Sequence, residues 1–159
     1  MQESQMVGCF KNCVSGLKRS ELNDITNNIY KTLEHPSGKE MLYFYLNSQN
    51  QSDNIKCLEL YDMCSQILQS DGKEQKLSLD TLINRVEVVR NNAVDVPPID
   101  TNLMRCFNQA LKSQGEQRKD LIDVLERTKD CCSGQLRSIH EDFQQYVTDN
   151  LATSCPGTS

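Results

Sequence analysis

Residues 37–64 constrain the fold most, because an apolar run, a polar run and an amphipathic run follow one another there without interruption. Ser37 and Glu40 have the spacing of a capping box, which predicts a helix that begins at Gly38 or Lys39. Apolar side chains then point in nearly every direction around this helix: Met41, Leu42, Phe44, Tyr45 and Leu46. The helix is therefore expected to be buried on most sides.

The polar run NSQNQS, residues 47–52, contains no apolar side chain and is expected to form an exposed connection. Apolar residues then recur at intervals of three and four, which predicts a helix with one buried face: Ile55, Leu58, Tyr61, Cys64 and Leu68. The segment is thus predicted to be a buried helix, a polar connection and an amphipathic helix.

The same intervals predict further helices elsewhere. One helix is expected over residues 20–35, one is expected to start at Ser78 or Asp80, and one is expected to be capped by Asp100. The buried face of the second of these helices is expected to contain Leu79, Leu82, Ile83, Val86 and Val89.

One apolar stripe passes from residue 116 to residue 146 through Gly134, where we expect a break or bend because glycine costs a helix about 1 kcal/mol. No segment of useful length has a period of two, so no sheet is predicted. The expected fold is all-α, a bundle of about seven to nine short helices. Its parts are an N-terminal amphipathic helix at 1–19, a helical domain at 20–150 and a disordered tail at 151–159.

Eight cysteines raise the question of the redox compartment. A disulfide framework would fit a secreted helical carrier, but the chain starts without the basic and apolar regions of a secretory signal, so an intracellular protein is expected. A zinc site is not indicated, because there is no CxxC pair and His35 and His140 stand alone. Cys57, Cys64 and Cys106 are expected to be small core residues.

The charge pattern argues against nucleic acid as a partner, because the formal net charge is −5 and the basic residues are not clustered. No stretch approaches the ~20 apolar residues that span a bilayer. A peripheral membrane contact remains as an alternative to docking for residues 6–19, with Cys9 and Cys13 as candidate lipidation sites. The expected localisation is cytoplasmic, and association with a membrane through this segment is the alternative.

No motif of a conventional enzyme occurs: a phosphate loop, GxSxG and HExxH are all missing from the sequence. No catalytic residue, cofactor or metal is therefore predicted. A helical domain with an amide-rich connection is better suited to contact another protein.

The segment GKEMLYFYLNSQNQSDNIKCLELYDMC resembles the early helices of the regulator of G-protein signalling (RGS) homology domain. That family's pattern is a glycine, a buried F-x-x-[FY]-L segment, a polar S-x-E-N loop and an amphipathic helix. Val96-Pro-Pro-Ile-Asp100 resembles the family's V-N-L-D cap, and Glu141-Asp-Phe-Gln-Gln-Tyr-Val147 resembles its D-S-Y-x-R-F-L ending. The chain is similar to a divergent member over about residues 20–150.

The resemblance implies a bundle of about nine helices that binds the switch regions of a GTP-bound Gα subunit. Such domains accelerate GTP hydrolysis without a catalytic group of their own. Asn54 would be the loop asparagine that reaches the catalytic glutamine of the G protein, since a carboxamide both donates and accepts, and Glu141 would contact a switch. The residues implied at the Gα surface are Gln49, Asn50, Asp53, Asn54, Pro98, Glu141, Asp142 and Gln145.

Several positions depart from the family pattern. Cys57 and Leu58 replace an aromatic pair. Pro98 replaces the second contact asparagine and has neither an N–H nor an amide side chain, and Gln145 replaces an arginine. Two functions therefore remain: a GTPase-activating domain for a Gα subunit, or an RGS-like module without this activity that scaffolds another signalling protein. A secreted disulfide-bonded carrier is a distant third.

Overall fold

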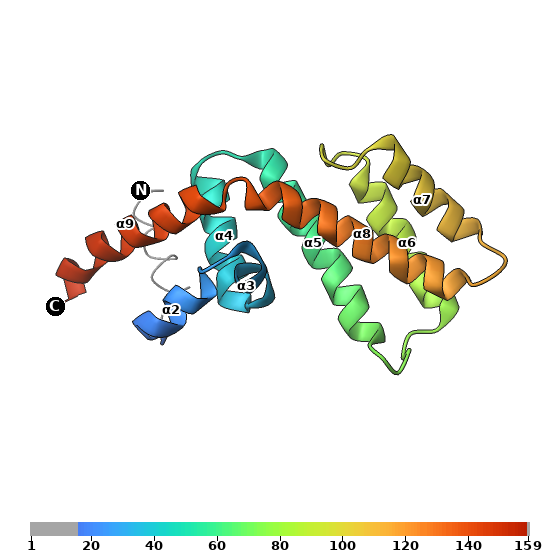
Figure 1. Cartoon of the computed structure of the whole chain (residues 1–159), viewed down its shortest axis with the longest axis horizontal. Helices are drawn as coiled ribbons and strands as arrows, with labels where there is room; N and C mark the ends of the chain where they lie inside the picture. The colour runs from blue at the N-terminus through green and yellow to red at the C-terminus, as the bar shows by residue number, and fades with distance from the viewer. Residues whose placement is uncertain (1–15, 159) are drawn as a thin grey trace. The chain divides into compact units, whose positions relative to one another are not determined.

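The computed structural model describes residues 16–158, and the side chains of residues 16–150. Within this range the chain forms eight helices and no strand, which confirms the all-α class and the expected seven to nine helices (Figure 1). They are α2 (Arg19–Ile25), α3 (Ile29–Glu34), α4 (Pro36–Ser48), α5 (Ser52–Asp71), α6 (Leu79–Ala93), α7 (Thr101–Lys112), α8 (Gln117–Arg137) and α9 (His140–Thr158). Cys9, Cys13 and most of the expected N-terminal helix lie outside the described residues.

The chain divides into two compact units. Unit 1 combines the described residues of Met1–Ile55 with those of Leu136–Ser159, and unit 2 is the continuous segment Lys56–Gln135. Unit 1 is therefore built from two segments that are distant in sequence.

The helix expected over residues 20–35 is interrupted, because unit 1 contains two short helices there. The first helix ends at Ile25, and Asn28 begins the second by accepting a hydrogen bond from the Lys31 backbone N–H through Oδ1, at 3.0 Å. An asparagine in this extended conformation is a favoured N-cap, so the local capping preference overrides the continuous apolar stripe.

The start of α4 also differs from the prediction, in which Ser37 was the cap. The helix begins at Pro36, and His35 caps it by accepting the Ser37 N–H on Nδ1 at 3.1 Å. Proline is well suited to the first helical position because its missing N–H would have no partner there. Met41, Leu42 and Leu46 are fully buried, but the buried residues follow one stripe and Tyr43 is 43% exposed, so α4 is buried on one face rather than on most sides.

Aromatic and polar contacts connect α4 and α3 to α9 within unit 1. The Tyr45 ring packs against Phe143 and Tyr146, with ring centroids 5.8 and 5.1 Å apart. The buried His140 places Nε2 2.9 Å from the Thr32 hydroxyl. These contacts join residues that are about a hundred positions apart in the sequence, and they close unit 1.

Unit 2 is organised by the antiparallel pair of α5 and α8. Three contacts set its register. Cys57 hydrogen-bonds to Cys132, Lys129 lies 5.2 Å from the Tyr61 ring centroid, and Arg118 forms an ion pair with Asp71 at 2.9 Å. From Cys57 to Asp71 on α5, the contacting residues on α8 run backwards from Cys132 to Arg118. The two helices therefore run in opposite directions.

The other two helices of unit 2, α6 and α7, run side by side (Figure 1). Ser78 caps α6 by accepting the Thr81 N–H, and Asp100 caps α7 by accepting the Leu103 N–H at 2.8 Å. Both caps agree with the sequence prediction.

The last two helices depart from the expected boundaries. The sequence predicted a break or bend at Gly134, but α8 passes through this residue without a break and ends at Arg137. The chain then turns at residues 138–139 before α9. The helix α9 continues to Thr158, through the segment for which the sequence predicted a disordered tail.

The described cysteines are all in the reduced form: Cys57, Cys64, Cys106, Cys131 and Cys132. Cys57 and Cys64 are buried as expected, whereas Cys106 is half-buried. Among residues 16–158, no helix has both the length and the apolar character needed to cross a bilayer.

Candidate partner-binding site

The connection between α4 and α5 presents amide side chains at the surface of unit 1. Asn50 has a φ of 55°, which is in the left-handed region that asparagine tolerates better than most residues. The backbone N–H groups of Gln49 and Gln51 bond to the carbonyls of Tyr45 and Leu46 at 3.1 and 3.0 Å. The turn is therefore fixed by its backbone, and the side chains of Gln49 and Asn50 remain exposed.

Asn54 lies in the first turn of α5 and belongs to a polar network. Its Nδ2 donates to Gln51 Oε1 at 2.6 Å. Gln51 also hydrogen-bonds to the Tyr45 hydroxyl, and the Asp142 carboxylate acts electrostatically on the same hydroxyl. The network thus connects two predicted contact residues, Asn54 on α5 and Asp142 on α9.

Burial raises the pKa of the Tyr45 hydroxyl, and Asp142 raises it further because a second negative charge nearby is unfavourable. The hydrogen bond with Gln51 acts in the opposite direction and lowers the pKa, as expected when the Gln51 amide donates to the Tyr45 oxygen. Since the Tyr45 ring packs on α9, Gln51 and Asn54 are positioned from the buried side of the unit. We call Tyr45, Gln51, Asn54 and Asp142 the polar edge.

The remaining α9 candidates lie close to the polar edge in sequence. Glu141 and Asp142 are both exposed in the first turn of α9, where carboxylates interact favourably with the helix dipole. The Gln145 side chain donates to Asp149 Oδ1 at 2.8 Å, one turn further along.

Pro98 belongs to unit 2, whereas the other candidate residues belong to unit 1. It lies in the connection between α6 and α7, and its carbonyl accepts a hydrogen bond from the Cys131 thiol at 3.2 Å. Asp53 is exposed in the first turn of α5.

The sequence missed two members of the polar edge. Tyr45 was expected only as a core residue and Gln51 only as a loop residue. In the structure the two side chains are hydrogen-bonded to each other. An aromatic hydroxyl next to an amide-rich connection was the available signal, because a buried tyrosine usually needs a partner for its hydroxyl.

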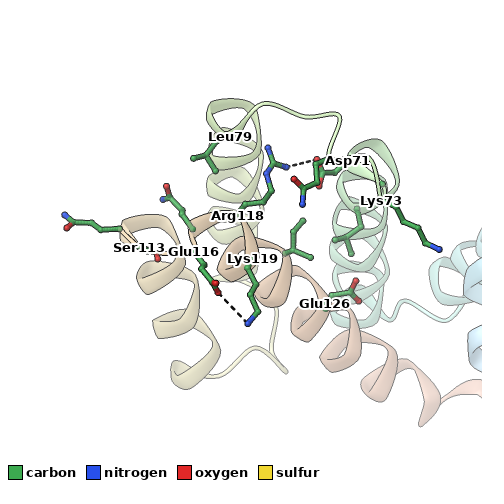
Figure 2. Close-up of a pocket in the computed structure, with 15 residues that line it drawn as sticks. Asp71, Lys73, Leu79, Ser113, Glu116, Arg118, Lys119 and Glu126 are labelled. Atoms are coloured by element: carbon green, nitrogen blue, oxygen red, sulfur yellow. Dashed lines mark hydrogen bonds and ion pairs between the residues drawn. The ribbon is translucent and has the colours of Figure 1, made fainter.

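A second candidate is the hollow of about 1140 Å³ at the end of unit 2 where α5 ends and α8 begins (Figure 2). Leu68, Leu79 and Ile122 form its apolar part, and Leu79 is 39% exposed although the sequence placed it in a buried face. The exposure follows from its position as the first residue of α6.

The polar part of the hollow is occupied by its own ion pairs. Arg118 bonds to Asp71 Oδ1 at 2.9 Å and to the Leu77 carbonyl at 2.5 Å, and Asp71 Oδ1 also accepts the Leu77 N–H. Glu116 lies 3.7 Å from Lys119 (Figure 2). Arg118 and Asp71 hold the connection between α5 and α6 to α8, which is a structural role, whereas the Glu116–Lys119 pair is local to the start of α8.

The chain matches no protein family, no curated protein and no solved structure. Among the residues that the structure describes, no cluster of histidine, cysteine and carboxylate side chains could hold a metal ion.

Proposed function

We propose that this protein is an RGS-like helical module that binds a signalling protein through the polar edge, and that its partner is a Gα subunit. The observation that carries the proposal is the network from Asn54 through Gln51 and Tyr45 to Asp142. It supports a surface in which an asparagine carboxamide is oriented before a partner arrives, which lowers the entropic cost of binding.

The proposed activity is acceleration of GTP hydrolysis on the partner. In this role Asn54 orients the catalytic glutamine of the G protein, while Glu141 and Asp142 contact a switch region. The protein stabilises one arrangement of the partner and supplies no reacting group.

A second function, binding without acceleration, is favoured by two specific observations. Pro98 presents no side-chain amide at the place of the second contact asparagine, and its carbonyl is engaged by Cys131. Gln145 is bonded to Asp149 and carries no charge. Under this alternative the polar edge serves as a scaffold for the same kind of partner.

Two measurements on a panel of Gα subunits separate the functions. Binding to the GDP–aluminium fluoride state is measured first, followed by single-turnover GTP hydrolysis with and without the protein. Binding with a faster rate supports the activating function, whereas binding with an unchanged rate supports the scaffold. If no subunit binds, Gα is excluded as the partner.

The variant Asn54→Ala tests the role of the polar edge. We expect it to abolish acceleration and to lower stability by about 1 kcal/mol, because the part-buried hydrogen bond to Gln51 is lost. Asn84→Ala is the matched control, since Asn84 is an exposed helical asparagine of unit 2. A large loss of stability in Asn54→Ala would instead identify Asn54 as a structural cap.

A further inference from the structure

The thiols of Cys57 and Cys132 face each other across the antiparallel pair of α5 and α8. The contacts of Tyr61 with Lys129 and of Asp71 with Arg118 set a register that places Cys57 opposite Cys132. The two thiols are hydrogen-bonded to each other, and both residues are fully buried and reduced. Disulfide formation requires two cysteines on neighbouring segments whose side chains point toward each other. We infer that Cys57 and Cys132 form a dithiol that hydrogen peroxide oxidises to a disulfide, which links α5 to α8 within unit 2.

The neighbouring cysteines are directed elsewhere. The Cys131 thiol donates to the Pro98 carbonyl at 3.2 Å, so it points to the connection between α6 and α7. The Cys106 sulfur accepts from Arg127 at 3.2 Å. Cys64 lies two helical turns, about 10 Å, beyond Cys57 on α5. It acts on Cys132 electrostatically, whereas Cys57 hydrogen-bonds to it. Among the described cysteines, the pair of Cys57 and Cys132 is therefore the one arranged for a bond.

The hydrogen bond to Cys57, together with burial, raises the pKa of the Cys132 thiol above its ordinary value. Deprotonation of Cys132 is therefore disfavoured, and the reaction is written with Cys57 as the attacking thiol.

The chemistry balances with one molecule of peroxide. The Cys57 thiol gives up its proton and attacks a peroxide oxygen, and the O–O bond breaks. The hydroxide that leaves takes up this proton, so a sulfenic acid and one water result. The Cys132 sulfur then attacks the sulfenic sulfur, the S–O bond breaks, and a second water leaves with the thiol proton. Two thiols are oxidised and one peroxide is reduced.

The disulfide is expected to form slowly and to stabilise unit 2. Oxidant must wait for the helices to separate transiently, because both sulfurs are fully buried. Once formed, the bond closes a loop of about 75 residues, which should raise the thermal midpoint of unit 2 by at least about 5 °C.

The test is performed on the full chain with hydrogen peroxide. After treatment, the protein is alkylated under denaturing conditions and digested without reduction, and the peptides are identified by mass spectrometry. We expect two fewer alkylated thiols, a cross-linked peptide that contains Cys57 and Cys132, and a higher thermal midpoint that dithiothreitol reverses. A urea concentration below the unfolding transition should speed the reaction.

Variants supply a control, although the peptide map alone decides the question. Cys132→Ala should form no cross-link at Cys57 after peroxide treatment. Cys106→Ala should form the Cys57–Cys132 cross-link as the parent protein does. The inference is overturned if every thiol remains available to alkylation, if another pair is cross-linked, or if Cys57 is oxidised to a sulfinic acid with Cys132 still a thiol.

Discussion

Adding one methyl group at Gly38 should destabilise unit 1, while the same change at Gly134 should stabilise unit 2. Gly38 is buried in α4, where this helix packs against α3. A Cβ at this position would lie 2.9 Å from the Thr32 carbonyl carbon, 3.0 Å from Ile25 Cγ2, and well inside van der Waals contact with the Thr32 carbonyl oxygen. At Gly134 no such neighbour lies within 4 Å.

The magnitudes follow from these contacts. At Gly38 the obstacle is backbone, so α3 and α4 must separate, and overpacking of this kind costs about 3 kcal/mol. The better helix propensity of alanine offsets at most about 1 kcal/mol, which leaves a net loss of about 2 kcal/mol. Gly134→Ala meets no obstacle and should gain up to about 1 kcal/mol.

Urea unfolding followed by far-UV circular dichroism measures both changes. Hydrogen exchange resolved by peptide then assigns each change to its unit, with faster exchange expected in α3 and α4 for Gly38→Ala. If Gly38→Ala is as stable as the parent, the close approach of α3 and α4 is wrong. If Gly134→Ala is destabilised, the continuous course of α8 through this residue is wrong.

Two further predictions concern buried polar groups. Burial lowers the pKa of His140, so the folded state favours its neutral form, and stability should be complete above the ordinary value of 6.5 and decline as the pH falls below it. His140→Gln should weaken this decline in urea titrations between about pH 7 and about pH 5, and an unchanged decline would assign it to other groups. Arg118→Ala should lower the free energy of unfolding by about 2–3 kcal/mol, because it leaves the Asp71 carboxylate buried without its cation. Asp71→Asn should lower it by about 1 kcal/mol, since Arg118 is partly exposed. Equal losses in urea unfolding would contradict this asymmetry.

The repeated apolar intervals were sufficient to predict the helices and several of their caps. Ser78 and Asp100 were predictable because a capping side chain acts on backbone only three residues away. Boundaries failed where two local signals competed. Asn28 acts as a cap although the apolar stripe continues past it, and His35 with Pro36 begins α4 ahead of the predicted Ser37–Glu40 capping pair.

The site was predictable only in part, because its organisation depends on contacts between distant segments. Asn54 and Asp142 were candidates from sequence, but the link through Tyr45 and Gln51 depends on how α9 packs against α4. The contact of Cys57 with Cys132 likewise depends on the register of α5 and α8, which no local pattern specifies.

The discontinuity of unit 1 imposes an order on folding. During synthesis, Lys56–Gln135 is complete before His140 is made, so the bundle of unit 2 can close while the second segment of unit 1, Leu136–Ser159, does not yet exist. Because Cys57 and Cys132 meet, closure brings the two ends of this segment together and shortens the effective loop between Thr32 and His140. Unit 2 thereby lowers the entropic cost of assembling the unit that carries the polar edge.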